Sequence, residues 1–318
     1  MRKYHDAVAA GVKELPMFRT DVSTGIFAEQ LVRYTLQEVF RFEYAQTKFA
    51  SGELVQIDTG VAEGAKEYSY LELDHSGRAE IVADNATDIP YADISGRNNI
   101  RQIQTLAVGI TYSTQDVRTA QLQGRFDIAT EKAQSAREAM DRLIDDLMRT
   151  GDNAAGLEGF TNHSGINVVQ APTGTWATAT SQQIVNDFNF AANASLIETD
   201  GVESPNTAIF PVEQWTRIST LPFDPAGGEA TVLEYLKRAH PRISLWTWEY
   251  GLKEVGAGGT PAVMVYNRDR NKVRGIVPML MRALPAEQDM LNFKLGFETR
   301  YGGIIAPKPR SIVRLDGV

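Results

Sequence analysis

The sequence contains no cysteine among its 318 residues. This absence excludes disulfides, zinc–thiolate sites, iron–sulfur clusters and cysteine nucleophiles. It has only four histidines, His5, His75, His163 and His240, and none lies four residues from another. The motifs of zinc proteases, P-loop enzymes, dinucleotide-binding folds and serine hydrolases are all missing. We therefore expect no catalytic residue, no cofactor and no metal site.

Long apolar runs are also missing, and no stretch approaches the roughly 18–20 residues that a membrane span needs. Asp6, Lys13 and Glu14 interrupt the first 18 residues, so we expect no signal peptide there. The formal net charge is −8. A protein that grips nucleic acid by neutralising phosphates is basic. The composition therefore predicts no membrane partner and no sequence-specific contact with DNA.

A long amphipathic helix is the clearest positive feature, and the segment DIATEKAQSAREAMDRLIDDLMRTGD predicts it over residues 127–150. Asp127 suits the N-cap, and Gly151 supplies the C-terminal stop. At about 1.5 Å per residue the helix is on the order of 35 Å long. Apolar residues recur at helical spacing and predict a narrow seam along one face, formed by Ala133, Ala136, Met140, Leu143 and Leu147.

Residues 46–104 are polar, rich in Asp and Gly, and contain short strand-like pieces such as KEYSYLEL and RAEIVA. A two- or three-stranded ribbon with so few core residues is marginal in isolation. We therefore predict an extended β-loop that lies on something outside itself. Its candidate contact residues between subunits are Tyr68, Tyr70, Leu71, Leu73 and Ile81.

The rest of the chain predicts an α+β fold. Residues 1–45 are interpreted as an arm that ends in a helical segment over 26–45, and residues 176–280 as a compact α+β domain. Alternating apolar residues predict strands at 105–113 and 291–301. Nothing after residue 280 is able to form a domain alone, so we expect residues 281–318 to return and pair with the strand at 105–113.

Two features support a different class of function. Paired carboxylates could hydrolyse a glycoside, and the extended loop holds Glu63, Glu67, Glu72, Asp74, Asp84, Asp88 and Asp93. Trp246 and Trp248 alternate on a predicted strand and could stack on a sugar or a base. A solvated acidic face, and tryptophans that pack in a core or a subunit contact, are the competing interpretations. An acidic-site hydrolase or carbohydrate-binding protein therefore remains an alternative.

The order of these parts resembles the major capsid proteins of tailed bacteriophages, whose Hong Kong 97-type shell fold is shared by encapsulins. The resemblance is strongest from TLAVGITYSTQDVRTAQLQG, through the long helix, to LMRTGDNAAGLEGFTNH. In one branch of that family a Gly-Asp closes the long helix and a Gly-Leu-x-Gly-hydrophobic-x-Asn-His run follows. The matching residues here are Gly151, Asp152, Gly156, Leu157, Gly159, Phe160, Asn162 and His163.

The resemblance implies a particular division of the chain. It has an N-terminal arm at 1–45, an extended β-loop at 46–104, a peripheral domain at 105–175 with its spine helix at about 127–150, an axial domain at 176–280, and return strands of the peripheral domain at 281–318. No long helical region precedes the arm, so we expect no built-in scaffolding segment. Some family members crosslink a Lys to an Asn, but nothing in the sequence pairs Lys66 with an Asn, so the sequence does not predict whether a crosslink forms.

The resemblance also implies a function. The chain is expected to be a structural protein without enzymatic activity, assembled in the host cytoplasm and located in the virion. Hexamers and pentamers would close into an icosahedral shell around double-stranded DNA. A separate scaffolding protein, a portal and decoration proteins are the implied partners besides the chain itself. An encapsulin-like nanocompartment shell is the alternative within the same fold.

Overall fold

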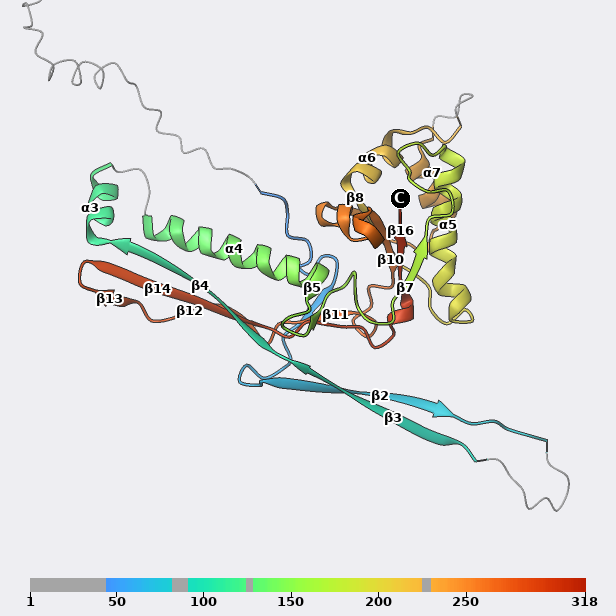
Figure 1. Cartoon of the computed structure of the whole chain (residues 1–318), viewed down its shortest axis with the longest axis horizontal. Coiled ribbons are helices and arrows are strands. Elements are labelled where there is room, and N and C mark those ends of the chain that lie inside the picture. The colour runs from blue at the N-terminus through green and yellow to red at the C-terminus, as the bar shows by residue number, and fades with distance from the viewer. Residues whose placement is uncertain (1–43, 82–90, 124–127, 225–229) are drawn as a thin grey trace, which may run out of the picture. The chain divides into compact units, whose positions relative to one another are not determined.

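The computed structural model describes residues 44–81, 91–123, 128–224 and 230–318 (Figure 1). Residues 45–318 form one compact unit. Most of the predicted arm, with its helix at 26–45, lies outside the described residues, as does Asp127. No helix in the described ranges is long and apolar enough to cross a membrane.

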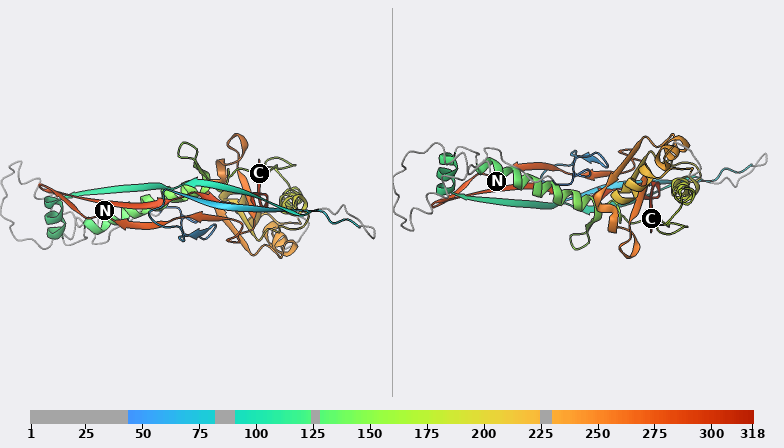
Figure 2. Two further views of the ribbon diagram at one scale, coloured as in Figure 1. Left: turned by 90° about the horizontal axis from the view of Figure 1, so that it is seen from below. Right: turned by 90° about the horizontal axis from the view of Figure 1, so that it is seen from above.

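A long helix and a long-stranded sheet form one part of this unit. Helix α4 (Ile128–Thr150) has 23 residues, and it packs along strand β4 (Gln104–Ser113), as both views in Figure 2 show. Strand β4 pairs with the equally long β14 (Asn292–Tyr301) over ten residues. The predicted pairing of these two segments is confirmed. The same sheet includes β12 (Met279–Ala283) and β13 (Glu287–Asp289), and helix α3 (Thr114–Gln123) follows β4.

A five-stranded mixed sheet forms the other main part, with the strand order β7-β16-β10-β8-β9. The strands are β7 (Asn167–Gln170), β16 (Ile312–Asp316), β10 (Ala262–Tyr266), β8 (Thr207–Pro211) and β9 (Leu245–Glu249). Strands β8 and β10 are buried along their whole length. The helices that accompany this sheet are α5 (Ser181–Glu198), α6 (Val212–Thr220) and α7 (Val232–Ala239).

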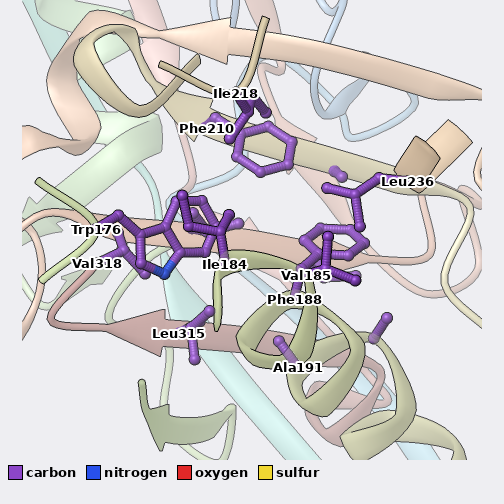
Figure 3. Packing of buried hydrophobic residues seen from close by; sticks show 14 of the residues in the cluster. Trp176, Ile184, Val185, Phe188, Ala191, Phe210, Ile218, Leu236, Leu315 and Val318 are labelled. Carbon is purple, nitrogen blue, oxygen red and sulfur yellow. The ribbon is translucent and has the colours of Figure 1, made fainter. Parts of the chain in front are cut away.

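Each face of the five-stranded sheet contributes to a different hydrophobic core. Because successive side chains of a strand point to opposite faces, Val263 and Val265 of β10 enter one core while Met264 and Tyr266 enter the other. The first core lies between the sheet and α5–α7 and is centred on Trp176, Phe188 and Phe210 (Figure 3). The second core receives the C-terminal half of α4. The sheet therefore joins the two parts of the unit.

Shorter elements complete the described chain. Strand β1 (Gln56–Asp58) pairs in parallel with β11 (Arg274–Ile276), which also pairs with β15 (Ile304–Ile305). Strands β5 (Gly151–Asp152) and β6 (Leu157–Glu158) pair directly after α4. Three 3-10 helices are η1 (Tyr250–Glu254), η2 (Ala257–Gly259) and η3 (Pro309–Ser311).

Two expectations about the course of the chain need correction. The return of residues 281–318 to the strand at 105–113 holds for β14 but is wrong for β16, which lies between β7 and β10. The physical reason is that β16 is buried on both faces, with Val313 and Leu315 in the first core and Ile312 in the second, as suits the interior of a two-sided sheet. Residues 46–58 are also not part of a coreless loop, because Phe49, Leu54 and Val55 are fully buried in the second core.

Candidate functional site

A two-stranded antiparallel ribbon carries on one face a row of apolar side chains that the rest of the described chain leaves uncovered. Strands β2 (Glu67–Ser76) and β3 (Asp93–Gln102) pair over ten residues. On one face the register brings together Leu71 and Leu73 of β2 with Ile94 and Ile100 of β3. These four side chains are 56–62% exposed. An exposed row of apolar side chains of this kind marks an interaction surface.

The root of the ribbon is fixed to the rest of the chain by polar contacts. Tyr68 donates a hydrogen bond of 2.8 Å from its hydroxyl to the Gly302 carbonyl oxygen. Burial raises the pKa of this tyrosine well above its ordinary value, so it remains a neutral donor. Arg101 reaches Glu158 at 2.9 Å between Nη2 and Oε2. The ribbon is thus held at one end, while its apolar face remains exposed.

A groove of about 1060 Å³ lies beside α4, between the helix, the strands β12 and β14, and residues 47–57. Its apolar lining includes Ala133, Ile144, Val277, Leu280, Met281 and Phe297. Arg137, Glu138 and Asp141 of α4 supply charged groups. Partial burial raises the pKa of Asp141, opposed by the nearby guanidinium of Arg137. The groove offers an apolar surface with a polar border, which is the composition of a protein–protein contact.

The run from Leu157 to His163 closes the C-terminal end of α4. The last carbonyl groups of a helix lack partners within the helix. Here the Phe160 amide donates to the Met148 carbonyl oxygen at 2.8 Å. The Asn162 amide nitrogen donates to the Thr150 carbonyl oxygen at 2.7 Å. A Cβ on Gly159 would lie 2.3 Å from the Thr150 carbonyl carbon, so only glycine permits this approach.

The same run connects the helix end to the ribbon root. Glu158 pairs with Arg101 of the ribbon, and His163 lies 3.3 Å from the same carboxylate, measured from Nε2 to Oε2. Burial lowers the pKa of His163, which favours the neutral ring near physiological pH. We conclude that the motif which carries the sequence resemblance joins α4 to the ribbon.

Replacing Asn162 with Ala is expected to destabilise the chain by about 1–2 kcal/mol, because two hydrogen bonds at the helix end are lost. The side-chain nitrogen of Asn162 donates to the Thr150 carbonyl oxygen, and its side-chain oxygen accepts from the Gly159 amide at 3.0 Å. Asn162→Asp keeps the acceptor but sets a carboxylate oxygen against the Thr150 carbonyl at the negative end of the helix, so it should be at least as destabilising. Urea unfolding of the wild type and both variants measures the effect. Equal stability of Asn162→Ala and the wild type would contradict the capping role.

A buried charge cluster links three segments where α4 meets the five-stranded sheet. Oδ1 of the buried Asp145 carboxylate accepts a hydrogen bond of 2.8 Å from the Phe49 amide. The guanidinium of Arg149 lies 3.7 Å from Asp145 and 3.8 Å from the fully buried Glu249 of β9. Lys48 donates to the Trp248 carbonyl oxygen at 2.5 Å. The cluster therefore ties the segment before the ribbon to both the helix and the sheet.

Glu249 should make stability depend on pH between about 4.5 and 7. Burial, with repulsion from Asp145, raises its pKa from 4.5 to about 7, although the Gly251 amide, Arg149 and Lys48 oppose the shift. A carboxyl whose pKa is higher in the folded state stabilises the fold below the unfolded pKa, and this contribution is lost as the pH rises towards the folded value. The loss is on the order of 3 kcal/mol.

The check is urea unfolding of the wild type and Glu249→Gln from about pH 4.5 to pH 8. Because glutamine does not titrate, the wild type should lose stability relative to the variant as the pH rises. Curves that run parallel over this range would show that the pKa of Glu249 is not raised.

The residues of the predicted seam of α4 do not all have the same surroundings in the structure. Ala136, Met140 and Leu147 are buried in the chain's own core. Leu143 is 43% exposed, and Ala133 lies in the lining of the groove. Ile144 and Met148, which were not predicted as part of the seam, are buried in the second core instead of Leu143. Adjacent apolar pairs at 143–144 and 147–148 left the rotation of the helix undecided, and the neighbouring sheet decides it.

The predicted contact residues of the ribbon also fall into two groups. Leu71 and Leu73 lie on the exposed apolar face, and Ile81, after the end of β2, is fully exposed. Tyr68 and Tyr70 lie on the opposite face and are partly buried, and Tyr68 is used for anchoring within the chain. The missed residues of the apolar face are Ile94 and Ile100. Their signal was the alternation in DISGRNNIRQ, which Gly and Asn obscure.

The two tryptophans that supported a sugar-binding protein pack within the chain. Trp246 stacks on Phe210 with ring centroids 6.1 Å apart and donates its indole N–H to Ile243. Lys48 covers the ring of Trp248, with Nζ 3.8 Å from the ring centroid. Within the described ranges, no group of three His, Cys, Asp or Glu side chains could hold a metal ion.

This subunit, with a long helix, a groove beside it, and a ribbon whose apolar face is uncovered, has the fold of phage capsid subunits. It superimposes on the capsid protein in "The capsid of Myoviridae Phage XM1" with a TM-score of 0.81, at 17% identity, covering 91% of this chain and 98% of that chain. The structure titled "Mycobacterium phage Bobi" gives a TM-score of 0.65 at 14% identity, covering 93% and 99%. The predicted α+β, Hong Kong 97-like fold is confirmed.

A family model described as "Major capsid protein" matches residues 77–318. The chain therefore belongs to the major capsid protein family, and its role is that of a structural capsid protein. No curated protein sequence matches it. The structure "Capsid of empty GTA particle computed with C5 symmetry" is also similar, with a TM-score of 0.56 at 14% identity and coverage of 94% and 99%.

Proposed function

We propose that copies of this chain assemble into hexamers and pentamers of an icosahedral shell around double-stranded DNA. In this proposal the β2–β3 ribbon of one copy lies in the groove beside α4 of a neighbouring copy. The observation that carries the proposal is that one chain presents two uncovered apolar surfaces of matching kind, the ribbon face and the groove. In the proposed assembly, the ribbon face of one copy and the groove of another cover each other.

The energetics favour this pairing. Fully burying a leucine or isoleucine side chain contributes roughly 1.5–3 kcal/mol. Leu71, Leu73, Ile94 and Ile100 are already more than one third buried, so each has somewhat less to gain. A single ribbon contact is therefore modest, but a closed shell repeats it at every copy. The root contacts of Tyr68 and Arg101 reduce the freedom that the ribbon must give up on binding.

The proposal assigns a role to each part of the chain. Residues 1–45 are the arm, and the ribbon with its tip is the extended loop. The part built on α4, β4 and β14 is the peripheral domain, and the part built on the five-stranded sheet is the axial domain. The net charge of −8 suits a container whose DNA is enclosed without sequence-specific contacts. Assembly in the host cytoplasm, with separate scaffolding, portal and decoration proteins, completes the proposal.

The test is to measure the size of the purified chain by light scattering and to image it by negative-stain microscopy over a concentration series. Closed hollow particles, or rings with five-fold and six-fold symmetry, are the expected result. A monomer or dimer that persists when the other head proteins are present would overturn the proposal.

A further inference from the structure

Two short segments of the chain are rich in positive charge. Residues 267–274 have the sequence NRDRNKVR, with four basic residues and one acidic residue. Residues 306–311 have the sequence APKPRS, with two basic residues and no acidic residue. The whole chain, by contrast, carries a formal net charge of −8. The two segments are therefore local exceptions to the overall charge of the protein.

A buried glutamate brings the two segments together. The carboxylate of Glu203 pairs with Lys272 of the first segment and with Lys308 of the second, the latter at 3.4 Å between Oε1 and Nζ. The side chain of Glu203 is only 4% exposed, whereas that of Lys308 is 55% exposed. One buried negative charge thus lies beneath two cations, and the second cation reaches the solvent.

Asp58 repeats this arrangement beside the first segment. Arg270 lies 2.8 Å and Arg274 lies 3.2 Å from the carboxylate oxygens of Asp58. The Asp58 side chain is 11% exposed, and that of Arg270 is 56% exposed. Each of the two carboxylates is therefore shared by two cations, which leaves a surplus positive charge towards the solvent. We define the cationic face as Arg270, Lys272, Arg274, Lys308 and Arg310.

Two further carboxylates lie at the border of the cationic face. Glu198 is 4.0 Å from the guanidinium of Arg310. Asp269 accepts a hydrogen bond of 2.8 Å from the Asn271 amide within its own turn. The balance on the face stays positive, because two of the four carboxylates are buried beneath its five cations.

The composition of the cationic face indicates its partner. The centre of a protein–protein interface is depleted of charge and rich in apolar side chains. In the described chain, none of the large exposed apolar side chains belongs to either segment. Exposed cations without an apolar centre suit a polyanion instead. Lys and Arg bind the phosphates of double-stranded DNA in this way, without regard to base sequence.

We propose that the cationic face points into the lumen of the shell and contacts phosphate groups of the enclosed double-stranded DNA. The excess of negative charge elsewhere on the chain limits the contact to this face. The proposed shell function, on which this inference rests, does not itself say which surface of the subunit meets the DNA.

The exposed cations can be removed without leaving a buried charge unpaired, because each buried carboxylate has a second partner. In the double variant Arg270→Gln and Lys308→Gln, the carboxylates beneath still pair with Arg274 and Lys272. The melting temperature should therefore stay close to that of the wild type. The double variant Lys237→Gln and Lys253→Gln is the matched control, since it removes the same charge from exposed positions outside both segments.

The first measurement is the fluorescence anisotropy of a labelled DNA duplex with free subunits over a salt series that begins at low salt. The variant of the cationic face should bind on the order of ten-fold more weakly than the wild type at low salt. The slope of log K against log salt should become shallower by about 2, because two phosphate contacts are lost. The control variant should bind nearly as the wild type does, and duplexes of unrelated sequence should give the same result.

Equal losses of affinity in the two double variants would overturn the inference, because net charge would then account for the binding. Wild-type subunits that bind no duplex at low salt would also overturn it. Both outcomes leave the shell function standing, since the binding measurement requires no assembly. Failure of the wild-type chain to form particles with the other head proteins present would instead reject the shell proposal.

Lysine acetylation of empty and DNA-filled particles, followed by mass spectrometry, tests the same face after assembly. Lys308 is 55% exposed and Lys253 is 66% exposed in the subunit. We expect filling with DNA to slow acetylation of Lys308 on the order of ten-fold and to leave that of Lys253 unchanged. Equal rates at Lys308 in empty and filled particles would contradict the inference. Protection of Lys308 already in empty particles would also contradict it, since a protein would then cover the face.

Discussion

Shortening the β2–β3 ribbon is expected to leave a folded subunit that no longer closes into shells. The variant removes residues 71–98 and joins Tyr70 to Asn99 through an Asn-Gly turn, which suits a two-residue hairpin loop. It keeps the hydrogen bond from Tyr68 to Gly302 and the ion pair of Arg101 with Glu158. None of the described residues that it removes belongs to either hydrophobic core. The melting temperature should therefore change little.

Assembly, in contrast, should be lost almost completely, because the variant lacks most of the face that fills a neighbour's groove. Light scattering of the wild type and the variant, at matched concentrations, measures the effect. The double change Leu71→Glu and Leu73→Glu is a milder form that keeps the ribbon, and Asp74→Asn, on the opposite face, is its matched control. Shells of normal yield from the shortened chain would show that the ribbon is not an assembly element.

Met140→Asp is expected to destabilise the fold by about 4 kcal/mol or more, whereas Leu143→Asp should cost less than about 1 kcal/mol. The two residues lie three positions apart on α4, but Met140 is 2% exposed and Leu143 is 43% exposed. A carboxylate at position 140 would replace a core side chain, and no water could hydrate its charge. At position 143 it would remain hydrated. Urea unfolding of both variants measures the difference directly.

The pair also tests the predicted seam of α4. If both substitutions cost the same, the helix is rotated relative to its arrangement in the structure, and Leu143 belongs to the core. If Leu143→Asp folds normally but assembles poorly, its exposed side chain lies in a contact between copies. The comparison requires that assembly be measured only for variants whose stability is close to that of the wild type.

Local patterns were sufficient to predict the elements with strong periodicity. The helix predicted over 127–150 is α4 at Ile128–Thr150, and the strands predicted at 105–113 and 291–301 are β4 and β14. These segments are long, and each shows one period without interruption, so local sequence determines their type. The ribbon was predicted for a different reason, because it contains too few core residues to stand alone.

Long-range packing could not be predicted from local sequence patterns. Strand β16 has only five residues, and its sequence does not show whether it pairs with β4 or with β10. The burial of Phe49 and Leu54 was not predicted, because a polar segment can still contribute a few buried side chains. The groove was missed entirely, since it combines α4 with Leu280, Met281 and Phe297, which lie more than 130 residues further along the chain.

The central claim is that the ribbon of one copy lies in the groove beside α4 of another. Hydrogen exchange of free subunits and of assembled particles, followed by mass spectrometry, tests it most directly. We predict that assembly slows exchange in both β2 and β3, and in the N-terminal half of α4, whose residues line the groove. Ribbon amides that exchange equally fast in subunits and in closed particles would contradict the account.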